Sequence, residues 1–91
     1  MHYALVSEDA DESLTYLQDR GFDVRVEERD LHAEYMARGE PGRASFFVPQ
    51  RRYSCVDLMR AAGTVARGYA HGKTAEDAIR AARRRLSSEQ A

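Results

Sequence analysis

The sequence predicts an α+β domain: a small antiparallel sheet of three to four strands with helices packed on one face. Three observations predict this class. Ninety-one residues, 43% of them hydrophobic, suit one small domain that spans residues 1–91 around a single core. Several short segments alternate apolar and polar residues, which is the period of a half-buried strand. Other segments repeat apolar residues every three or four positions between helix-capping signals, and the resulting order is approximately β-α-β-(α)-β-β-β-α.

The beginning of the chain predicts a strand followed by a helix. Residues 2–7 (HYALVS) predict a short strand. Ser7 or Asp9 then supplies a side-chain oxygen that caps a helix running to about Arg20, and acidic residues fill the first turn of that helix. Gly21 ends the helix, because glycine tolerates the left-handed backbone that follows a helix terminus.

A second strand, a short helix and a turn are predicted next. Residues 22–28 (FDVRVEE) alternate apolar and polar positions as in a half-buried strand. Residues 30–39 also alternate in this way, but Asp30 is a good helix cap and Gly39 a good helix end. The intervening HAEYMAR is rich in helix formers, so we favour a short helix. Residues 40–42 (EPG) predict a turn.

The second half predicts three strands and a long helix. Residues 44–48 (ASFFV) predict a short apolar strand. Residues 52–60 (RYSCVDLMR) and 64–70 (TVARGYA) predict a hairpin joined by the turn AAG. Residues 75–88 repeat apolar residues at helical spacing and predict an amphipathic helix. Along residues 52–60 the two faces of the strand carry Tyr53, Cys55 and Asp57 on one side, and Val56 and Leu58 on the other.

Charge is distributed unevenly along the chain. Residues 1–40 hold eleven acids and four bases, giving −7, whereas residues 41–91 hold four acids and ten bases, giving +6, for a total of −1. Such asymmetry indicates either that the two halves attract each other, within one fold or across a dimer, or that the basic half faces a polar partner.

The composition gives no sign of membrane insertion or export. The sequence has no long apolar run, and its beginning, MHYALVSEDADE, lacks the basic and apolar regions of a signal peptide. The single cysteine, Cys55, has no partner for an internal disulfide. We therefore expect a cytoplasmic protein with no membrane partner.

Residues 68–86 (GYAHGKTAEDAIRAARRRL) look like a phosphate-binding loop that leads into a helix. The loop is one residue shorter than G-x-x-x-x-G-K-[ST], so it cannot surround a phosphate with the same backbone N–H groups. Gly72 is better explained as a turn residue, and Thr74 with Asp77 as a capping box at a helix start. Glu76 and Arg80 have the spacing of an i, i+4 ion pair.

No catalytic constellation is present in the sequence. His2, His32 and His71 do not combine with the one cysteine into a metal-binding pattern such as C-x-x-C or H-E-x-x-H. Cys55 lies in an alternating strand and is expected to be packed rather than nucleophilic. We therefore expect no catalytic residue, no metal and no cofactor, and hence not an enzyme.

Residues 52–86 resemble the C-terminal half of a double-stranded RNA-binding domain. Gly68, Gly72 and Lys73 match its Gly-containing strand and basic turn, and the Ala-rich helix that follows matches its packing face. The resemblance implies phosphate contacts from basic residues, whereas Glu76 and Asp77 stand where that family has lysines and would repel phosphate. In this interpretation the nucleic-acid-binding residues are Arg51, Arg52, Arg67, His71, Lys73, Arg80 and Arg84.

The same hairpin and helix also resemble the N-terminal part of HicB-type antitoxins. The matching residues form G-K-T-A-E-D-A, from Gly72 to Ala78. This resemblance implies a non-catalytic, protein-binding fold.

Two functions follow from these observations. The first is a small non-catalytic binding or regulatory module that acts through protein–protein contacts and self-associates, with a protein partner or a homodimer as its complex. The alternative is nucleic-acid binding through the basic second half. Residues 46–53 (FFVPQRRY) fit either function, because their aromatic residues could stack on bases or lie in a core.

Overall fold

A computed structural model describes residues 9–90 of the chain. The predicted strand at residues 2–7 lies outside these described residues. The remaining elements are α1 (Ala10–Asp19), β1 (Asp23–Arg29), α2 (Leu31–Ala37), α3 (Pro41–Ala44), β2 (Tyr53–Arg60), β3 (Gly63–Gly72) and α4 (Ala75–Glu89). None of the helices within residues 9–90 is long and apolar enough to cross a membrane.

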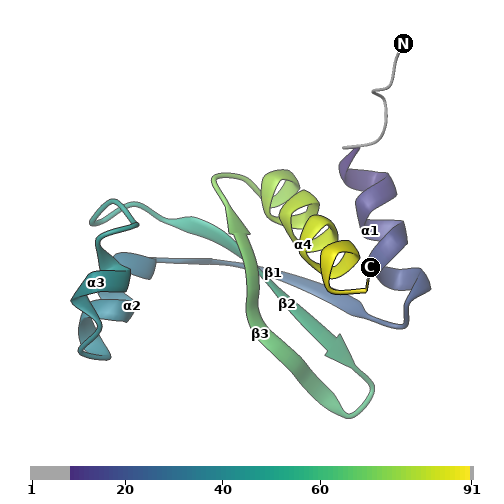
Figure 1. The fold of residues 1–91 in the computed structure, drawn as a ribbon, viewed down its shortest axis with the longest axis horizontal. Helices are drawn as coiled ribbons and strands as arrows, with labels where there is room; N and C mark the ends of the chain where they lie inside the picture. The colour runs from purple at the N-terminus through teal and green to yellow at the C-terminus, as the bar shows by residue number, and fades with distance from the viewer. Residues whose placement is uncertain (1–8, 91) are drawn as a thin grey trace.

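The three strands form one antiparallel sheet in the order β1-β2-β3, so β2 is central. Val26 of β1, Val56 of β2 and Ala70 of β3 lie side by side in the register. The predicted fold class, a small α+β domain with an antiparallel sheet, is confirmed (Figure 1).

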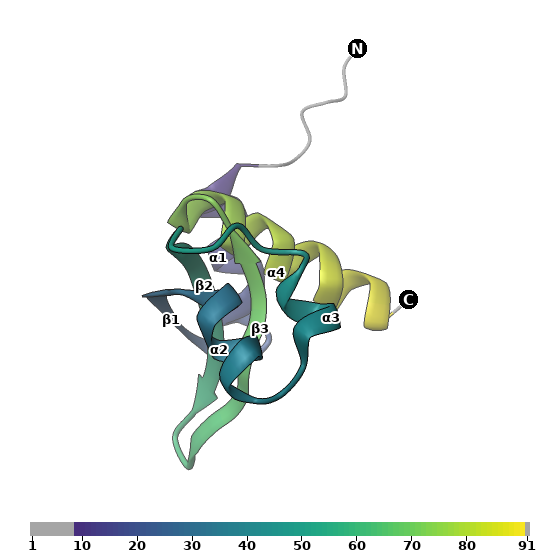
Figure 2. The same cartoon turned by 90° about the vertical axis from the view of Figure 1, so that its left-hand side faces the viewer.

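The two longer helices, α1 and α4, cover one face of this sheet, on the right of Figure 1. The core between them and the sheet holds the buried residues Leu17, Val56, Leu58, Tyr69, Ala70, Ala78, Ala82 and Leu86. The short helices α2 and α3 lie at the other end of the molecule, and Figure 2 shows them in front of the sheet. They pack on the opposite face, where Leu31 meets Tyr53 and Cys55 in a second small core. The predicted alternation of side chains along β2 is therefore confirmed.

Local signals in the sequence explain where α1 begins and ends. Asp9 caps the helix, because its carboxylate accepts the N–H of Asp11 at 2.7 Å and that of Glu12 at 3.3 Å. Gly21 has φ +89°, and the N–H groups of Gly21 and the next residue bond back to the carbonyls of Gln18 and Leu17. This hydrogen-bond pattern is a Schellman motif, which places glycine in the left-handed conformation.

The start of α4 also follows the prediction. Thr74 caps the helix by accepting the N–H of Asp77 at 3.1 Å. Arg80 Nη1 lies 2.9 Å from Asp77 Oδ1, so the arginine neutralises this acid one turn into the helix. The apolar stripe of α4 buries Ala78, Ala82 and Leu86 against the sheet.

Two predictions between β1 and β2 are wrong. The turn predicted at residues 40–42 is the start of α3, since Pro41 occupies the first helical position, where its fixed φ and missing N–H are tolerated. The strand predicted at residues 44–48 is absent from the described chain. Ala44 ends α3, and the N–H groups of Phe46 and Phe47 continue its turns by bonding to the carbonyls of Arg43 and Ala44.

Candidate functional site

The strongest candidate site lies on the segment between β1 and β2, residues 31–48, which we call the α2–α3 arm. Asp30 caps α2 by accepting the N–H of Ala33 at 3.0 Å. The arm is closed by His32, whose Nδ1 lies 2.9 Å from the Ala44 carbonyl and 3.1 Å from the Phe47 carbonyl. Both neighbours are acceptors, so this nitrogen carries the proton and joins α2 to the turn after α3.

Phe47 is the centre of an aromatic cluster that joins the arm to the sheet. Its ring is stacked on Tyr35 with centroids 5.7 Å apart and an interplanar angle of 11°. It meets Tyr53 and His71 edge-on, with centroids at 5.2 Å and 5.0 Å. The Tyr53 hydroxyl in turn accepts the N–H of Val48 at 3.0 Å. Such aromatic pairs stabilise a packed arrangement by about 0.5–1.5 kcal/mol each beyond the area they bury.

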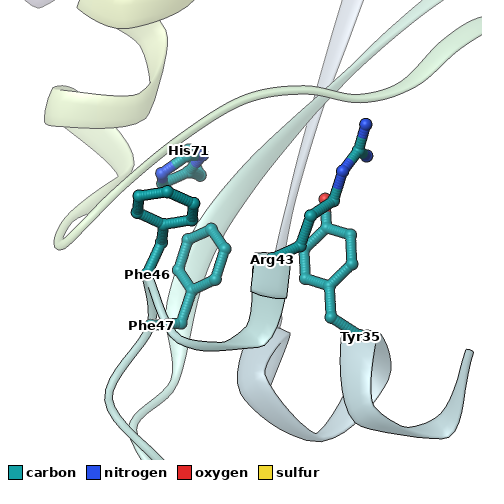
Figure 3. A pocket seen from close by; sticks show the side chains of 5 residues that line it. All are labelled: Tyr35, Arg43, Phe46, Phe47 and His71. Atoms are coloured by element: carbon teal, nitrogen blue, oxygen red, sulfur yellow. The ribbon is translucent and has the colours of Figure 1, made fainter. Parts of the chain in front are cut away.

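This cluster forms the base of an open pocket of about 430 Å³. Figure 3 shows Phe46, Phe47 and His71 on one side of the pocket, and Tyr35 with the Arg43 guanidinium on the other. Phe46 is 82% exposed, which is unusual for a side chain of its size. The pocket therefore combines apolar walls with one cation and one imidazole.

A partly buried ion pair joins the arm to the sheet. Arg29, at the end of β1, is 9% exposed and donates from Nε to Glu34 Oε2 of α2 at 2.9 Å, and from Nη2 to Oε1 of the same carboxylate. This bidentate geometry is the strong form of a carboxylate–arginine contact. Hydrogen bonding from Arg29 lowers the pKa of the Glu34 carboxyl, and the same contact raises the pKa of Arg29.

A second polar contact lies inside the sheet. Asp57 is fully buried and accepts the Gly68 N–H at 2.7 Å and the Arg25 guanidinium at 3.0 Å. The register shifts here, so that this one residue of β2 faces residues 67–69 of β3, and Gly68 has φ +65°. A β-bulge leaves backbone groups of the bulged strand outside the regular ladder. Here the N–H of Gly68 is satisfied by the Asp57 carboxylate instead.

We expect the Arg29–Glu34 pair to make the stability of the protein dependent on pH. The Glu34 pKa is lowered in the folded chain, so its stabilisation is fully present above the ordinary carboxyl pKa and is lost as the pH falls through the lowered value. We expect Glu34→Gln to lose about 1 kcal/mol of stability at neutral pH, because the amide keeps one acceptor for Arg29. Urea unfolding at pH 7 and in acid measures this effect.

The matched control is Glu28→Gln, since Glu28 forms only an exposed pair with Arg52 at 3.8 Å. The wild type and this control should lose stability in acid more steeply than Glu34→Gln. Equal acid sensitivity of all three proteins would show that the Arg29–Glu34 pair contributes nothing to folding.

The basic residues that the sequence suggested for nucleic-acid binding are distributed over several elements. Arg51 and Arg52 precede β2, Arg67 and His71 lie in β3, Lys73 follows it, and Arg80 and Arg84 belong to α4. Among them, His71 lines the pocket. Arg52 is paired with Glu28 and Arg80 with Asp77. Arg51, Arg67 and Lys73 are exposed and form no ion pair within residues 9–90.

The sequence identifies part of the pocket, since His71 is among the predicted binding residues. Tyr35 and Arg43 were not identified, although Phe46 and Phe47 belong to the aromatic segment that the sequence singled out. The available signal was the number of aromatic residues in two segments that lie close along the chain. Their meeting depends on α3, which the sequence did not predict.

The described residues contain no group of three or more His, Cys, Asp or Glu side chains that could hold a metal ion. Cys55 is 1% exposed, and burial raises the pKa of its thiol. The expectation that this cysteine is packed is confirmed.

Comparison with known proteins gives no match to this chain, whether with family models, with curated proteins or with solved structures.

Proposed function

We propose that the chain is a non-catalytic protein-binding module whose α2–α3 arm receives an apolar side chain of a partner protein. The observation that carries this proposal is Phe46, which is 82% exposed at the rim of a pocket with aromatic walls. Exposed aromatic residues beside a concave apolar surface are the usual anchors of protein interfaces. An occupant would remove both Phe46 and the pocket walls from water.

Exposed apolar residues are concentrated on this arm. The large hydrophobic side chains exposed within residues 9–90 are Met36, Phe46, Val48 and Val65. Three of these four belong to the arm, while Val65 lies near the hairpin turn between β2 and β3. This distribution favours the arm as the contact surface over the rest of the described chain.

The ionisable groups of the pocket suit recognition rather than catalysis. Arg43 is 68% exposed, and its contact with Glu40 at 3.6 Å is an exposed pair of small energetic value. Its guanidinium is therefore available to an acidic group next to the apolar side chain of the partner. The residues that line the pocket include no aspartate, glutamate, cysteine, serine or lysine.

The charge map supports a protein partner over a nucleic acid. Arg52 of the basic second half pairs with Glu28 of the acidic first half. Arg80 and Arg85 pair with the α4 acids Asp77 and Glu89. Neutralisation of phosphates by basic side chains supplies most of the affinity for nucleic acids. Arginines that are already paired with acids inside the fold therefore favour nucleic-acid binding less.

We expect Phe46→Ser to abolish retention of the partner without weakening the fold, since the exposed ring contributes little to stability. The matched control is Val65→Ser, which removes an exposed apolar side chain from outside the arm. The measurement is a pull-down from native lysate with the three proteins, with size-exclusion chromatography and light scattering to establish their masses.

The proposal predicts a protein that the wild type and Val65→Ser retain and that Phe46→Ser does not. A partner retained equally by all three proteins would contradict the pocket as the binding site. A strictly monomeric chain that retains no protein would contradict the proposal as a whole. Salt-sensitive binding of a double-stranded RNA at low ionic strength would favour the alternative function instead.

A further inference from the structure

We propose that β1 pairs with β1 of a second copy, antiparallel and centred on Val26, so that two sheets join into one of six strands. This inference rests on the proposed function, protein–protein contact, but uses a surface apart from the pocket. In the described chain β1 pairs with β2 alone, so its other edge has no strand partner (Figure 2). An unpaired edge presents a row of free backbone N–H and C=O groups to another strand.

The sequence of β1, DVRVEER, is complementary to itself when it is reversed about Val26. In that register Arg25 of one copy faces Glu27 of the other, and by symmetry the same contact forms twice. Asp23 is placed opposite Arg29 of the other copy, and Val26 opposite its own equivalent. Opposite charges at directly facing positions stabilise an antiparallel pair, whereas like charges destabilise it.

Neighbouring registers lack this complementarity. A two-fold axis perpendicular to the sheet keeps each face on its own side, so only registers centred on a residue are allowed. Centring on Arg25 places that arginine opposite itself and Asp23 opposite Glu27. Centring on Glu27 places that glutamate opposite itself and Arg25 opposite Arg29. The Val26 register is the one of these three that places opposite charges together.

The charged side chains on either side of Val26 are available for this contact. The side chains of Arg25 and Glu27 are 46% and 38% exposed and already lie 3.7 Å apart within one chain. Pairing two copies would bring two arginines and two glutamates into one neutral cluster on one face of the joined sheet. Arg25 keeps its contact with the buried Asp57, which holds its guanidinium on that face.

Charge reversal at one position tests the register. We expect the wild type to be a dimer by sedimentation analysis, and Glu27→Lys to raise the dimer dissociation constant by about tenfold or more, since two contacts become repulsive at once. The matched control is Glu28→Lys, which makes the same charge change at the adjacent position, where the facing residue is Val24. The control should stay within about threefold of the wild type.

A cysteine on the symmetry axis gives an independent test. Facing Cα atoms in an antiparallel pair are about 4.5–5.5 Å apart, within the span of a disulfide. Val26→Cys is therefore expected to form a covalent dimer on mild oxidation. Position 28 is more exposed than position 26, so Glu28→Cys is the control. In the proposed register the two cysteines at position 28 would be about 13 Å apart and should not cross-link. The native Cys55 is buried in both variants, and circular dichroism verifies their folding.

A wild-type protein that stays monomeric would overturn the inference, because the free edge of β1 would then not pair with a second copy. A dimer that Glu27→Lys leaves intact, with no cross-link at position 26, would overturn it as well. These outcomes are separate from failure of the proposed function. A monomer that still retains a Phe46-dependent partner contradicts only the edge pairing, and a β1-paired dimer without such a partner contradicts only the pocket.

Discussion

Replacing Asp57 with alanine is expected to lower the free energy of unfolding by about 3 kcal/mol. Its side chain is fully buried and accepts the Gly68 N–H at 2.7 Å as well as the Arg25 guanidinium. Alanine would leave that N–H without a partner in the bulge and open a cavity in the central strand. Both consequences destabilise the folded state, because buried polar groups and empty space each cost free energy.

Two substitutions separate these effects in urea unfolding. Asp57→Asn keeps an oxygen for the Gly68 N–H and loses only the charge facing the half-exposed Arg25, so its cost should be about 1 kcal/mol. Asp23→Ala, an exposed acid on β1, should stay within about 0.5 kcal/mol of the wild type. If Asp57→Ala were as stable as Asp23→Ala, the bulge would not depend on this carboxylate.

Replacing Gly72 with alanine is expected to cost about 1–3 kcal/mol, the range found for overpacked interiors. A Cβ atom at this position would lie 2.6 Å from Asp77 Cβ and 2.7 Å from the backbone nitrogen of Ala78. Those atoms belong to the first turn of α4, which rests on the sheet and cannot move without disturbing the core. The substitution should therefore push α4 away from the end of β3.

The matched control is Gly42→Ala, because a Cβ atom there has no neighbour within 4 Å and the residue lies in α3. This change should be neutral or stabilise the protein by about 0.5–1 kcal/mol. Thermal and urea unfolding of the two variants measure the difference. Equal stability of the two variants would mean that β3 and α4 do not approach as closely as described.

The same glycine shows where sequence reasoning reached its limit. Gly72 was predicted as a turn residue, but the structure requires it for the close approach of β3 to α4. Both roles produce a glycine between a strand and a helix, so the sequence alone could not separate them. By contrast, Asp9, Gly21, Asp30 and Thr74 act locally as caps and ends, and local signals were sufficient to place their helices.

The arm was the hardest part to predict. Residues 44–48 have the apolar composition of a strand, yet within residues 9–90 they pair with no strand, and Phe47 packs into the aromatic cluster instead. Tertiary contacts thus overrode the local β propensity. The pocket depends on the contacts of Phe47 with Tyr35 and with His71, and His71 lies on another element, the strand β3. The local spacing of apolar and polar residues contains no information about contacts between different elements of the fold.

The central claim is that Phe46 is the anchor of a protein contact, and site-specific photo-cross-linking tests it most directly. Phe46→p-benzoyl-phenylalanine places a photoreactive ring at the rim of the pocket, and the same analogue at Val65 is the control. We predict that irradiation in native lysate yields a discrete covalent adduct with a protein from position 46 and none from position 65. Indistinguishable products from the two positions, or no protein adduct from position 46, would contradict the claim.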